Sequence, residues 1–189
     1  MELFMKLGIR SVSIDDICSG LGISKKTIYV HFKNKKELVH EVILFHIHKE
    51  IDDLQQISLE SKNAIDEMIG IAKYVLEFLR NMSPSILYDL KKYYSVSWKI
   101  VEEKHMSYIQ QVIANNISKG IEEGYYRDSI NKDIVSKLYV SKAMAVVDEN
   151  IFPSKTYKRF KLYEELIIYH MYGIVSDKGR KYIKKVQLN

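Results

Sequence analysis

Apolar residues recur every three to four positions along most of the chain, which is the spacing of helices that bury one face. The segment 63–82 is a clear case, because five apolar side chains follow this spacing: Ile71, Tyr74, Val75, Phe78 and Leu79. The 189 residues include only two prolines and eight glycines, too few for an all-β protein with many tight turns. The pattern therefore predicts an all-α fold.

Local capping signals divide this pattern into separate helices. Ser13 and Asp16 form a capping-box pair, Ser24 has the side chain of an N-cap, and Asn34 precedes Glu37 in the same way. We expect about nine helices: one that ends at Leu7 before Gly8, then 14–21, 25–32, 35–57, 63–82, 84–94, 97–123, 131–147 and 156–176.

Residues 13–32 have the layout of a helix-turn-helix, because two helices of about eight residues flank a turn that contains glycine. Its expected core is apolar and consists of Ile17, Leu21, Ile23, Ile28 and Phe32. Cys18 lies where the two helices would cross closely, so a buried and inert thiol is expected.

The charge of this motif suggests what it could bind. Five lysines and no acidic residue lie between Ile17 and Lys36, although the net charge of the whole chain is only +5. Lysines, hydroxyl groups and a helix N-terminus are groups that bind DNA phosphates and base edges. The pattern alone leaves two readings open, DNA binding or a small three-helix core with a solvated lysine face.

The segment GIRSVSIDDICSGLGISKKTIYVHFKNKKELV, residues 8–39, resembles the DNA-binding head of the TetR family of transcriptional regulators. The resemblance implies phosphate contacts from Ser13, Thr27, Tyr29, His31 and Lys35. It implies base contacts from Lys25 and Lys26, with Ser24 in the same DNA-binding set. Relative to the family pattern the first helix is short, and Lys26 stands where glycine is frequent.

Two later segments, 120–127 and 170–174, resemble the end of the family's seventh helix and its last helix. The resemblance implies a DNA-binding domain over 1–45 and a ligand-binding and dimerisation domain over 46–189. Tyrosines can line an apolar cavity and still offer hydroxyl groups to a ligand. The residues expected at the ligand pocket are Tyr74, Phe78, Tyr88, Trp98, Met106 and Ile109. Each of them is also compatible with plain core.

The last predicted helix is apolar on two sides, which indicates that a partner covers one of them. One stripe contains Tyr163, Leu166, Ile167, His170, Met171 and Ile174, and the second contains Ile168, Tyr172 and Val175. The family resemblance implies a four-helix bundle between two subunits, so we expect the second stripe at an isologous homodimer interface.

Several classes of protein are not expected. A single cysteine excludes an internal disulfide, the first residues lack the features of a signal peptide, and no apolar run approaches the ~18 residues of a membrane span. We therefore expect a cytoplasmic protein without membrane contact. His40, His46 and His48 lie on different faces of one predicted helix, so no metal site is expected. The common nucleotide-binding and hydrolase motifs are absent, so neither a cofactor nor an enzyme is expected. The basic run 178–185 is expected to be a solvated end.

The sequence thus predicts a dimeric regulator that binds a pseudo-palindromic DNA duplex. The family resemblance further implies a repressor that a small apolar or aromatic effector releases. The alternative is a helical small-molecule binding or interaction protein that does not bind DNA.

Overall fold

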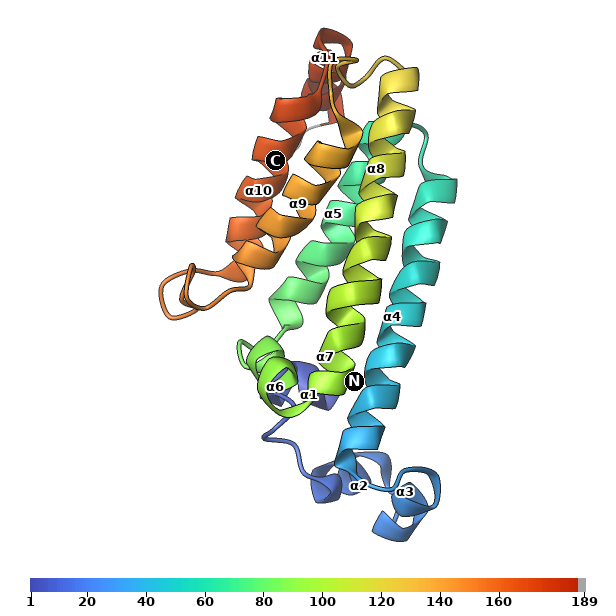
Figure 1. Cartoon of the computed structure of the whole chain (residues 1–189), viewed down its shortest axis with the longest axis vertical. Coiled ribbons are helices and arrows are strands. Elements are labelled where there is room, and N and C mark those ends of the chain that lie inside the picture. Colours follow the sequence, from blue (N-terminus) through green and yellow to red (C-terminus); the bar gives the residue numbers. More distant parts are fainter. Residues whose placement is uncertain (187–189) are drawn as a thin grey trace. The chain divides into compact units, whose positions relative to one another are not determined.

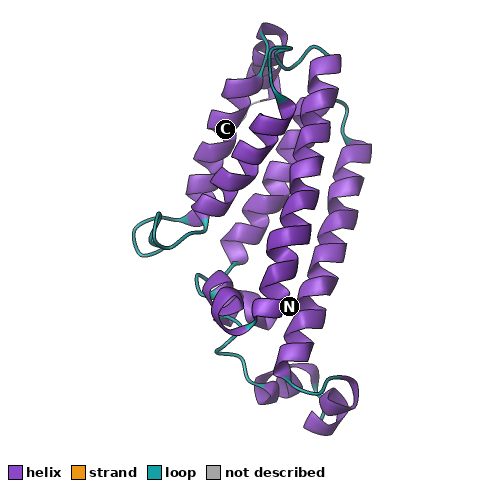
Figure 2. Cartoon of the chain, viewed as in Figure 1, coloured by secondary structure: helices purple, strands orange, loops and turns teal. Residues whose placement is uncertain are grey.

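The computed structural model of the chain describes residues 1–186, and its regular elements are helices (Figure 2). The prediction of an all-α fold is confirmed. The helices, labelled in Figure 1, are α1 (Glu2–Leu7), α2 (Ile14–Leu21), α3 (Lys25–His31), α4 (Lys35–Glu60), α5 (Ala64–Asn81), α6 (Ile86–Tyr93), α7 (Ser95–Ile100), the π-helical turn η1 (Val101–His105), α8 (Met106–Glu122), α9 (Lys132–Val146), α10 (Arg159–Ile174) and α11 (Asp177–Val186). Within residues 1–186, none of these helices is both long and apolar enough to span a bilayer.

The helices form two compact units. Unit 1 contains residues 1–52 and 81–105, and unit 2 contains residues 53–80 and 106–186. Helix α4 runs through both, because the division falls after Asp52. The units differ in extent from the domains expected at 1–45 and 46–189, since α6 and α7 group with the helix-turn-helix.

Unit 1 is held together around the turn between α1 and α2. The turn begins at Gly8, whose φ of +84° is readily adopted only by glycine. The backbone N–H of Ser83 donates to the Met5 carbonyl over 2.7 Å, and the N–H of Arg10 donates to Asp89 Oδ2 over 2.9 Å. Asp89 belongs to α6 and is only 4% exposed. These bonds fix the start of the chain on α6.

Unit 2 has a polar cluster in its core. Asn116 of α8 is fully buried; its Nδ2 donates to the Ala64 carbonyl over 2.9 Å, and its Oδ1 accepts from the Tyr126 hydroxyl over 3.0 Å. A Cβ at Gly120 would collide with the Tyr126 ring, so only glycine lets that ring pack against α8. Burial raises the pKa of Tyr126, which keeps its hydroxyl protonated as a donor. The cluster explains why glycine and tyrosine stand together in the segment 120–127.

The basic run 178–185 is solvated as expected, but it is not a plain tail, because residues 177–186 form α11 with a buried apolar side. Ile183 is 1% exposed, and the Tyr182 hydroxyl donates to both carboxylate oxygens of Asp66 over 2.9–3.0 Å. Lys178 Nζ donates to the Glu123 carbonyl over 2.6 Å and lies 4.2 Å from the centre of the Tyr125 ring. Helix α11 is therefore amphipathic and buries its apolar side in unit 2.

Two predicted helix starts also differ from the structure. Pro84 lies in the turn before α6, which begins two residues later at Ile86. The long helix expected over 97–123 begins at Ser95, and a π-helical turn at Val101–His105 separates α7 from α8. A π-helical turn holds one more residue per hydrogen-bonded ring than an α-helix, and sequence periodicity gives no signal for it.

Candidate nucleic-acid interface

The helix-turn-helix of unit 1 begins with a complete capping box. The backbone N–H of Asp16 donates to Ser13 Oγ over 3.1 Å, and the N–H of Ser13 donates to Asp16 Oδ2 over 2.7 Å. The bond from Ser13 also lowers the pKa of the Asp16 carboxyl group. At the turn, Gly22 takes a left-handed conformation with φ +65° and ends α2. The predicted cap and glycine turn are confirmed.

Helix α3 is fixed by a cap at Ser24 and by one buried residue. The N–H of Thr27 donates to Ser24 Oγ over 3.1 Å, and Ile28 is 5% exposed. The other side chains of α3 face solvent: Lys25, Lys26, Thr27, Tyr29, Val30 and His31. This short helix therefore presents two lysines, a hydroxyl group, a phenol and an imidazole, with no acidic residue among them.

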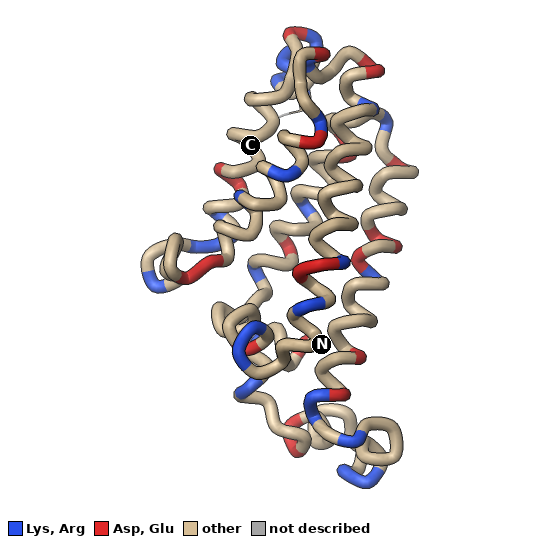
Figure 3. The backbone as a smooth tube through the Cα atoms, viewed as in Figure 1, with Lys and Arg blue, Asp and Glu red and all other residues tan. Residues whose placement is uncertain are grey.

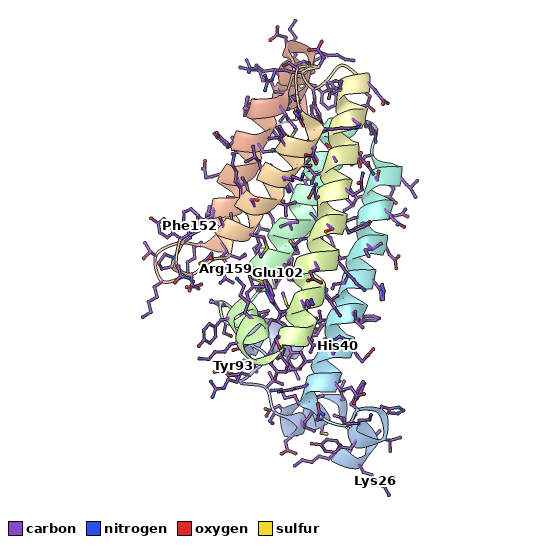
Figure 4. All side chains as sticks on the ribbon, viewed as in Figure 1. Lys26, His40, Tyr93, Glu102, Phe152 and Arg159 are labelled. Carbon is purple, nitrogen blue, oxygen red and sulfur yellow. The ribbon has the colours of Figure 1, made fainter. Side chains whose placement is uncertain are left out.

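The two lysines at the start of α3 differ in their surroundings. Lys25 Nζ forms an ion pair with Asp15 Oδ1 over 2.9 Å, although both side chains are more than half exposed. Lys26 forms no ion pair with the described residues and extends away from the helix (Figure 4). Basic positions gather at both ends of α3, at Lys25 and Lys26 and again over 33–36 (Figure 3). An exposed ion pair is weak, so Asp15 leaves Lys25 available to a phosphate.

The side chain of Lys35 is hydrogen-bonded within unit 1. Its Nζ donates to the Ile9 carbonyl over 2.7 Å and lies 3.3 Å from the Arg10 carbonyl oxygen. Burial lowers the pKa of this ammonium group, while Asp89 and Asp16 act in the opposite direction. The side chain implied to contact phosphate thus holds the α1–α2 turn in the structure.

Part of the expected helix-turn-helix core is wrong. Ile17, Cys18 and Ile28 are buried as predicted, and Phe32 is half-buried. Leu21 is 66% exposed and Ile23 is 37% exposed, so neither side chain belongs to the core of the helix-turn-helix. The spacing of apolar residues identified these helices but not which of their apolar side chains other elements cover.

Comparison with known proteins agrees with this geometry. A family model described as "Bacterial regulatory proteins, tetR family" matches residues 1–42. The HTH-type transcriptional repressor KstR2 of Mycobacterium tuberculosis is 24% identical over 146 residues, which are 70% of this chain and 68% of the relative. The solved structure of that protein matches with a TM-score of 0.56 and 18% identity over 93% of this chain and 90% of its own. The regulatory protein TetR from Rhodobacter sphaeroides matches with a TM-score of 0.75 and 13% identity over 92% and 94% of the two chains.

Residues 1–42 thus match the DNA-binding domain of the TetR family, and TetR-family regulators match most of the chain by sequence and by fold. The chain shares with these relatives the helix-turn-helix of a DNA-binding transcriptional regulator, and they are not enzymes. The TetR-family fold accounts for the extent of the match to solved structures, which covers both units.

The six residues expected at the effector pocket are divided between the units. Tyr88 and Trp98 belong to unit 1, where Tyr88 is 53% exposed and Lys91 Nζ lies 4.8 Å from the centre of a Trp98 ring. The other four, which belong to unit 2 and are all half-buried, are Tyr74, Phe78, Met106 and Ile109.

The four residues of unit 2 come from similar levels of two antiparallel helices. The bond between Asn116 and the Ala64 carbonyl places the end of α8 beside the start of α5. Equal steps of about 1.5 Å per residue along both helices then bring Tyr74 close to the level of Met106. Those four residues therefore fit one region of unit 2.

A groove in unit 1 contains none of the predicted pocket residues. It has a volume of ≈ 330 Å³ and lies between the α3–α4 turn and the α6–α7 junction. The residues that line it are Lys33, Asn34, Lys36, Glu37, His40, Tyr93, Tyr94, Ser95, Val96 and Ser97. Figure 4 labels His40 and Tyr93, one from each wall.

The exposed apolar face of unit 2 differs from the predicted interface stripe. Ile168 and Tyr172 are 39% and 42% exposed, but Val175 is only 2% exposed. Val175 pairs with Tyr126 in an isolated antiparallel bridge, so it belongs to the core of its own unit. The exposed apolar face also includes Tyr169 of α10 and Ile134 and Leu138 of α9, which are 68%, 54% and 49% exposed.

Two histidines near the π-helical turn lie beside a carboxylate. His105 Nε2 is 3.0 Å from Glu50 Oε2, and burial lowers the pKa of His46, one turn before Glu50 on α4. Within residues 1–186, no three histidine, cysteine, aspartate or glutamate side chains are arranged to hold a metal ion. The pair of His105 and Glu50 is therefore described as a structural contact of unit 1.

Three residues that fix the helix-turn-helix on α6 carry no signal in the sequence: Arg10, Asp89 and Tyr93. Arg10 Nη1 donates to the Tyr93 hydroxyl over 2.6 Å, and its guanidinium lies 4.7 Å from the centre of that ring. Asp89 accepts from the Arg10 backbone, as described above. These pairs are more than 75 positions apart in the sequence, so no local pattern could have indicated them.

Proposed function

We propose that the chain is a sequence-specific repressor that reads duplex DNA with α3. The observation that carries the proposal is the exposed face of α3, which offers Lys25, Lys26, Thr27, Tyr29 and His31 without an acidic residue. Lys26 has a free ammonium group at the start of the helix, where side chains of helix-turn-helix proteins reach base edges. Ser13 and Ser24 cap α2 and α3 with their hydroxyl groups. They therefore lie beside the first backbone N–H groups of these helices, which can donate hydrogen bonds to a phosphate.

Lys35 has a different role in this proposal. Its ammonium group is bound to two backbone carbonyls, so it positions the α1–α2 turn and does not neutralise a phosphate. The DNA-binding set is then Ser13, Ser24, Lys25, Lys26, Thr27, Tyr29 and His31, with Lys35 as a positioning residue.

The test is a titration of the full chain into labelled duplexes that carry the DNA upstream of its own gene. Fluorescence anisotropy at several KCl concentrations gives both the affinity and its salt dependence. A regulator of this type binds one duplex at least about 10³-fold tighter than a scrambled duplex. Equal binding to both duplexes, or none to either at low salt, contradicts the proposal and favours a helical binding protein that does not read DNA.

We propose further that a small apolar or aromatic effector releases the DNA. The support is the composition of unit 2, where Tyr74, Phe78, Met106 and Ile109 occupy similar levels of α5 and α8. KstR2, a relative by sequence and fold, is described as a ketosteroid transcriptional regulator. Coupling of about 1–3 kcal/mol would change DNA affinity 5–150-fold. Calorimetric titration of a candidate compound with and without operator must then show the same factor in its own affinity.

We also propose a homodimer built on α9 and α10. Their exposed apolar side chains are Ile134, Leu138, Ile168, Tyr169 and Tyr172. The two helices run antiparallel through the connection 147–158, so Ile134 lies near the level of Tyr172. An apolar face of this kind, repeated by a two-fold axis, forms an isologous interface.

A further inference from the structure

The groove of unit 1 lies between the helix-turn-helix, at the α3–α4 turn, and the junction of α6 and α7. One wall carries Lys33 and Lys36, and the other carries Tyr93 and Val96. His40 Nδ1 and Ser97 Oγ lie 3.3 Å apart and connect the two walls. A ligand in this groove would therefore contact the α3–α4 turn and the α6–α7 junction together.

The groove is positively charged. Lys33 and Lys36 line it, and the Tyr93 ring has the Arg10 guanidinium at 4.7 Å and Lys92 Nζ at 5.5 Å from its centre. The carboxylate of the lining residue Glu37 accepts from the Lys33 backbone N–H over 2.5 Å. Four cations thus lie in or beside the groove, against two carboxylates: Glu37, which already has a donor, and Asp89, which lies near the lining residue Tyr94 and accepts from the Arg10 backbone. The charge balance favours an anion.

The rest of the lining combines the aromatic rings of Tyr93 and Tyr94 and the apolar side chain of Val96 with four polar residues: Asn34, His40, Ser95 and Ser97. The Val96 side chain is 72% exposed at the edge, and the Tyr93 ring is half-buried. A volume of ≈ 330 Å³ lies at the lower end of the range for small-molecule sites. The ligand that fits these walls has one or two fused aromatic rings.

We propose that this groove binds a small aromatic carboxylate. The rings lie against the wall of Tyr93 and Val96, and the carboxylate faces Lys33 and Lys36. The site is separate from Tyr74, Phe78, Met106 and Ile109, and it goes beyond the proposed effector because none of those residues lines the groove.

The test uses 2-naphthoate and its neutral analogue 2-naphthalenemethanol with the full chain and no DNA, so its failure would not bear on DNA binding. Affinities are measured by calorimetry, and ring contacts are detected by saturation-transfer NMR. We expect saturable 1:1 binding of 2-naphthoate. K33Q/K36Q removes two exposed ion pairs between the lysines and the ligand carboxylate, so its affinity for 2-naphthoate should fall by about 3–10-fold. Its affinity for the neutral alcohol should not change. V96E places a like charge in the groove and should weaken 2-naphthoate by about tenfold or more.

Two variants control for general surface effects. K62Q removes an exposed lysine of unit 2, and V30E adds a carboxylate to the exposed face of α3; both should bind 2-naphthoate as the wild type does. Circular dichroism melts confirm that each variant folds. Lack of saturable binding to the wild type, equal affinity in V96E, or an unchanged preference for the anion in K33Q/K36Q would each overturn the proposal.

Discussion

At the scale of single residues, lysines of the same helix-turn-helix have opposite tasks. Lys26 is exposed and has no partner among the described residues, whereas Lys35 gives its ammonium group to the carbonyls of Ile9 and Arg10. A free lysine can release a counterion from DNA, but a lysine bound to backbone carbonyls contributes to folding. Substitution of the two residues should therefore affect different measurements.

Lys26→Ala should weaken binding to the operator more than binding to a scrambled duplex, because the lost contact reaches a base edge, and it should reduce the slope of log affinity against log salt by at most about 0.9, since one cation is removed from the duplex. Its free energy of unfolding should stay within about 0.5 kcal/mol of the wild type. Lys35→Ala should leave the salt slope unchanged and lower the free energy of unfolding by about 1–2 kcal/mol, because two carbonyls lose their donor. Anisotropy titrations and urea unfolding separate the two cases, with Lys62→Ala as the exposed control. A flatter slope for Lys35→Ala would return Lys35 to the phosphate contacts.

His170 should make folding sensitive to mild acid. The ring is 8% exposed and packs against Tyr139 at 4.9 Å between centres, and burial, together with Lys142, lowers its pKa from 6.5 to about 4. Between these pH values the unfolded chain binds more protons than the native chain, so stability is complete above pH 6.5 and declines as the pH falls towards 4. Each pH unit in this window costs up to about 1.4 kcal/mol. Relative to His170→Gln, the wild type should lose about 1–2 kcal/mol between pH 6.5 and 5 in urea unfolding. Parallel pH profiles of the two proteins would exclude this role of His170.

At the scale of elements, α6 is the helix that receives the α1–α2 turn. Asp89 and Tyr93 of α6 bind the backbone and the guanidinium of Arg10, and Asp89 also lies near enough to Lys35 to affect its pKa. The position of the head thus depends on a helix that precedes the long α7–η1–α8 stretch in the sequence.

Asp89→Ala should destabilise unit 1 by about 1–3 kcal/mol, because the Arg10 N–H loses its acceptor in a buried place. Asp89→Asn keeps an oxygen acceptor and should cost less than half as much. Urea unfolding measures both variants. An equal loss in the two would show that the charge of Asp89, and not the hydrogen bond, stabilises the turn.

Helix α11 contributes to the stability of unit 2. Ile183→Ala removes a side chain that is 1% exposed and should lower the free energy of unfolding by about 2 kcal/mol or more. Lys185→Ala, on the exposed side of the same helix, should change it by less than about 0.5 kcal/mol. Similar unfolding curves for both variants would mean that α11 opens before the unit unfolds.

The sequence predicted those features that depend on neighbouring residues. The caps at Ser13, Ser24 and Asn34 are confirmed, because a cap is made by a side chain and an amide only three positions apart. Features set by distant contacts were not predictable. The exposure of Leu21 and the burial of Val175, which pairs with Tyr126, both depend on segments far away in the sequence.

The candidate site was predicted to a similar extent. The exposed face of α3 follows from its sequence. The hydrogen bond from Lys35 to the Ile9 carbonyl joins residues 26 positions apart, so the sequence pattern could not indicate it. The six expected pocket residues share aromatic or apolar character, which does not tell core from cavity and did not reveal that they belong to two units.

At the scale of the whole molecule, the proposed function requires two copies of the chain. Two-fold symmetry of a homodimer gives inverted half-sites, with centres about one turn of the duplex, or a multiple of it, apart. An interface of α9 and α10 would bury Ile134, Leu138, Ile168, Tyr169 and Tyr172, which are costly to leave in water.

Ile168→Glu combined with Tyr172→Glu should convert the dimer into a monomer of 22.2 kDa at micromolar concentration. The two-fold symmetry would place four carboxylates in one interface, where they repel one another and lose their hydration. Leu59→Glu, at a residue of α4 that is 81% exposed, is the control and should remain dimeric. Sedimentation velocity measures all three proteins. A wild type that sediments as a monomer would refute the interface.

Cys18 can report on the local stability of the helix-turn-helix. It is the one thiol of the chain, and it is buried between α2 and the helices around it. A buried thiol reacts with a modifying reagent only while the surrounding structure is open, so the rate of labelling under native conditions measures the free energy of that opening. The same sample can be followed with duplex DNA or with 2-naphthoate present, and slower labelling would report how much each ligand stabilises the head. The placement of a single sulfur atom thus allows the local stability of the DNA-reading segment to be measured in the unmodified sequence.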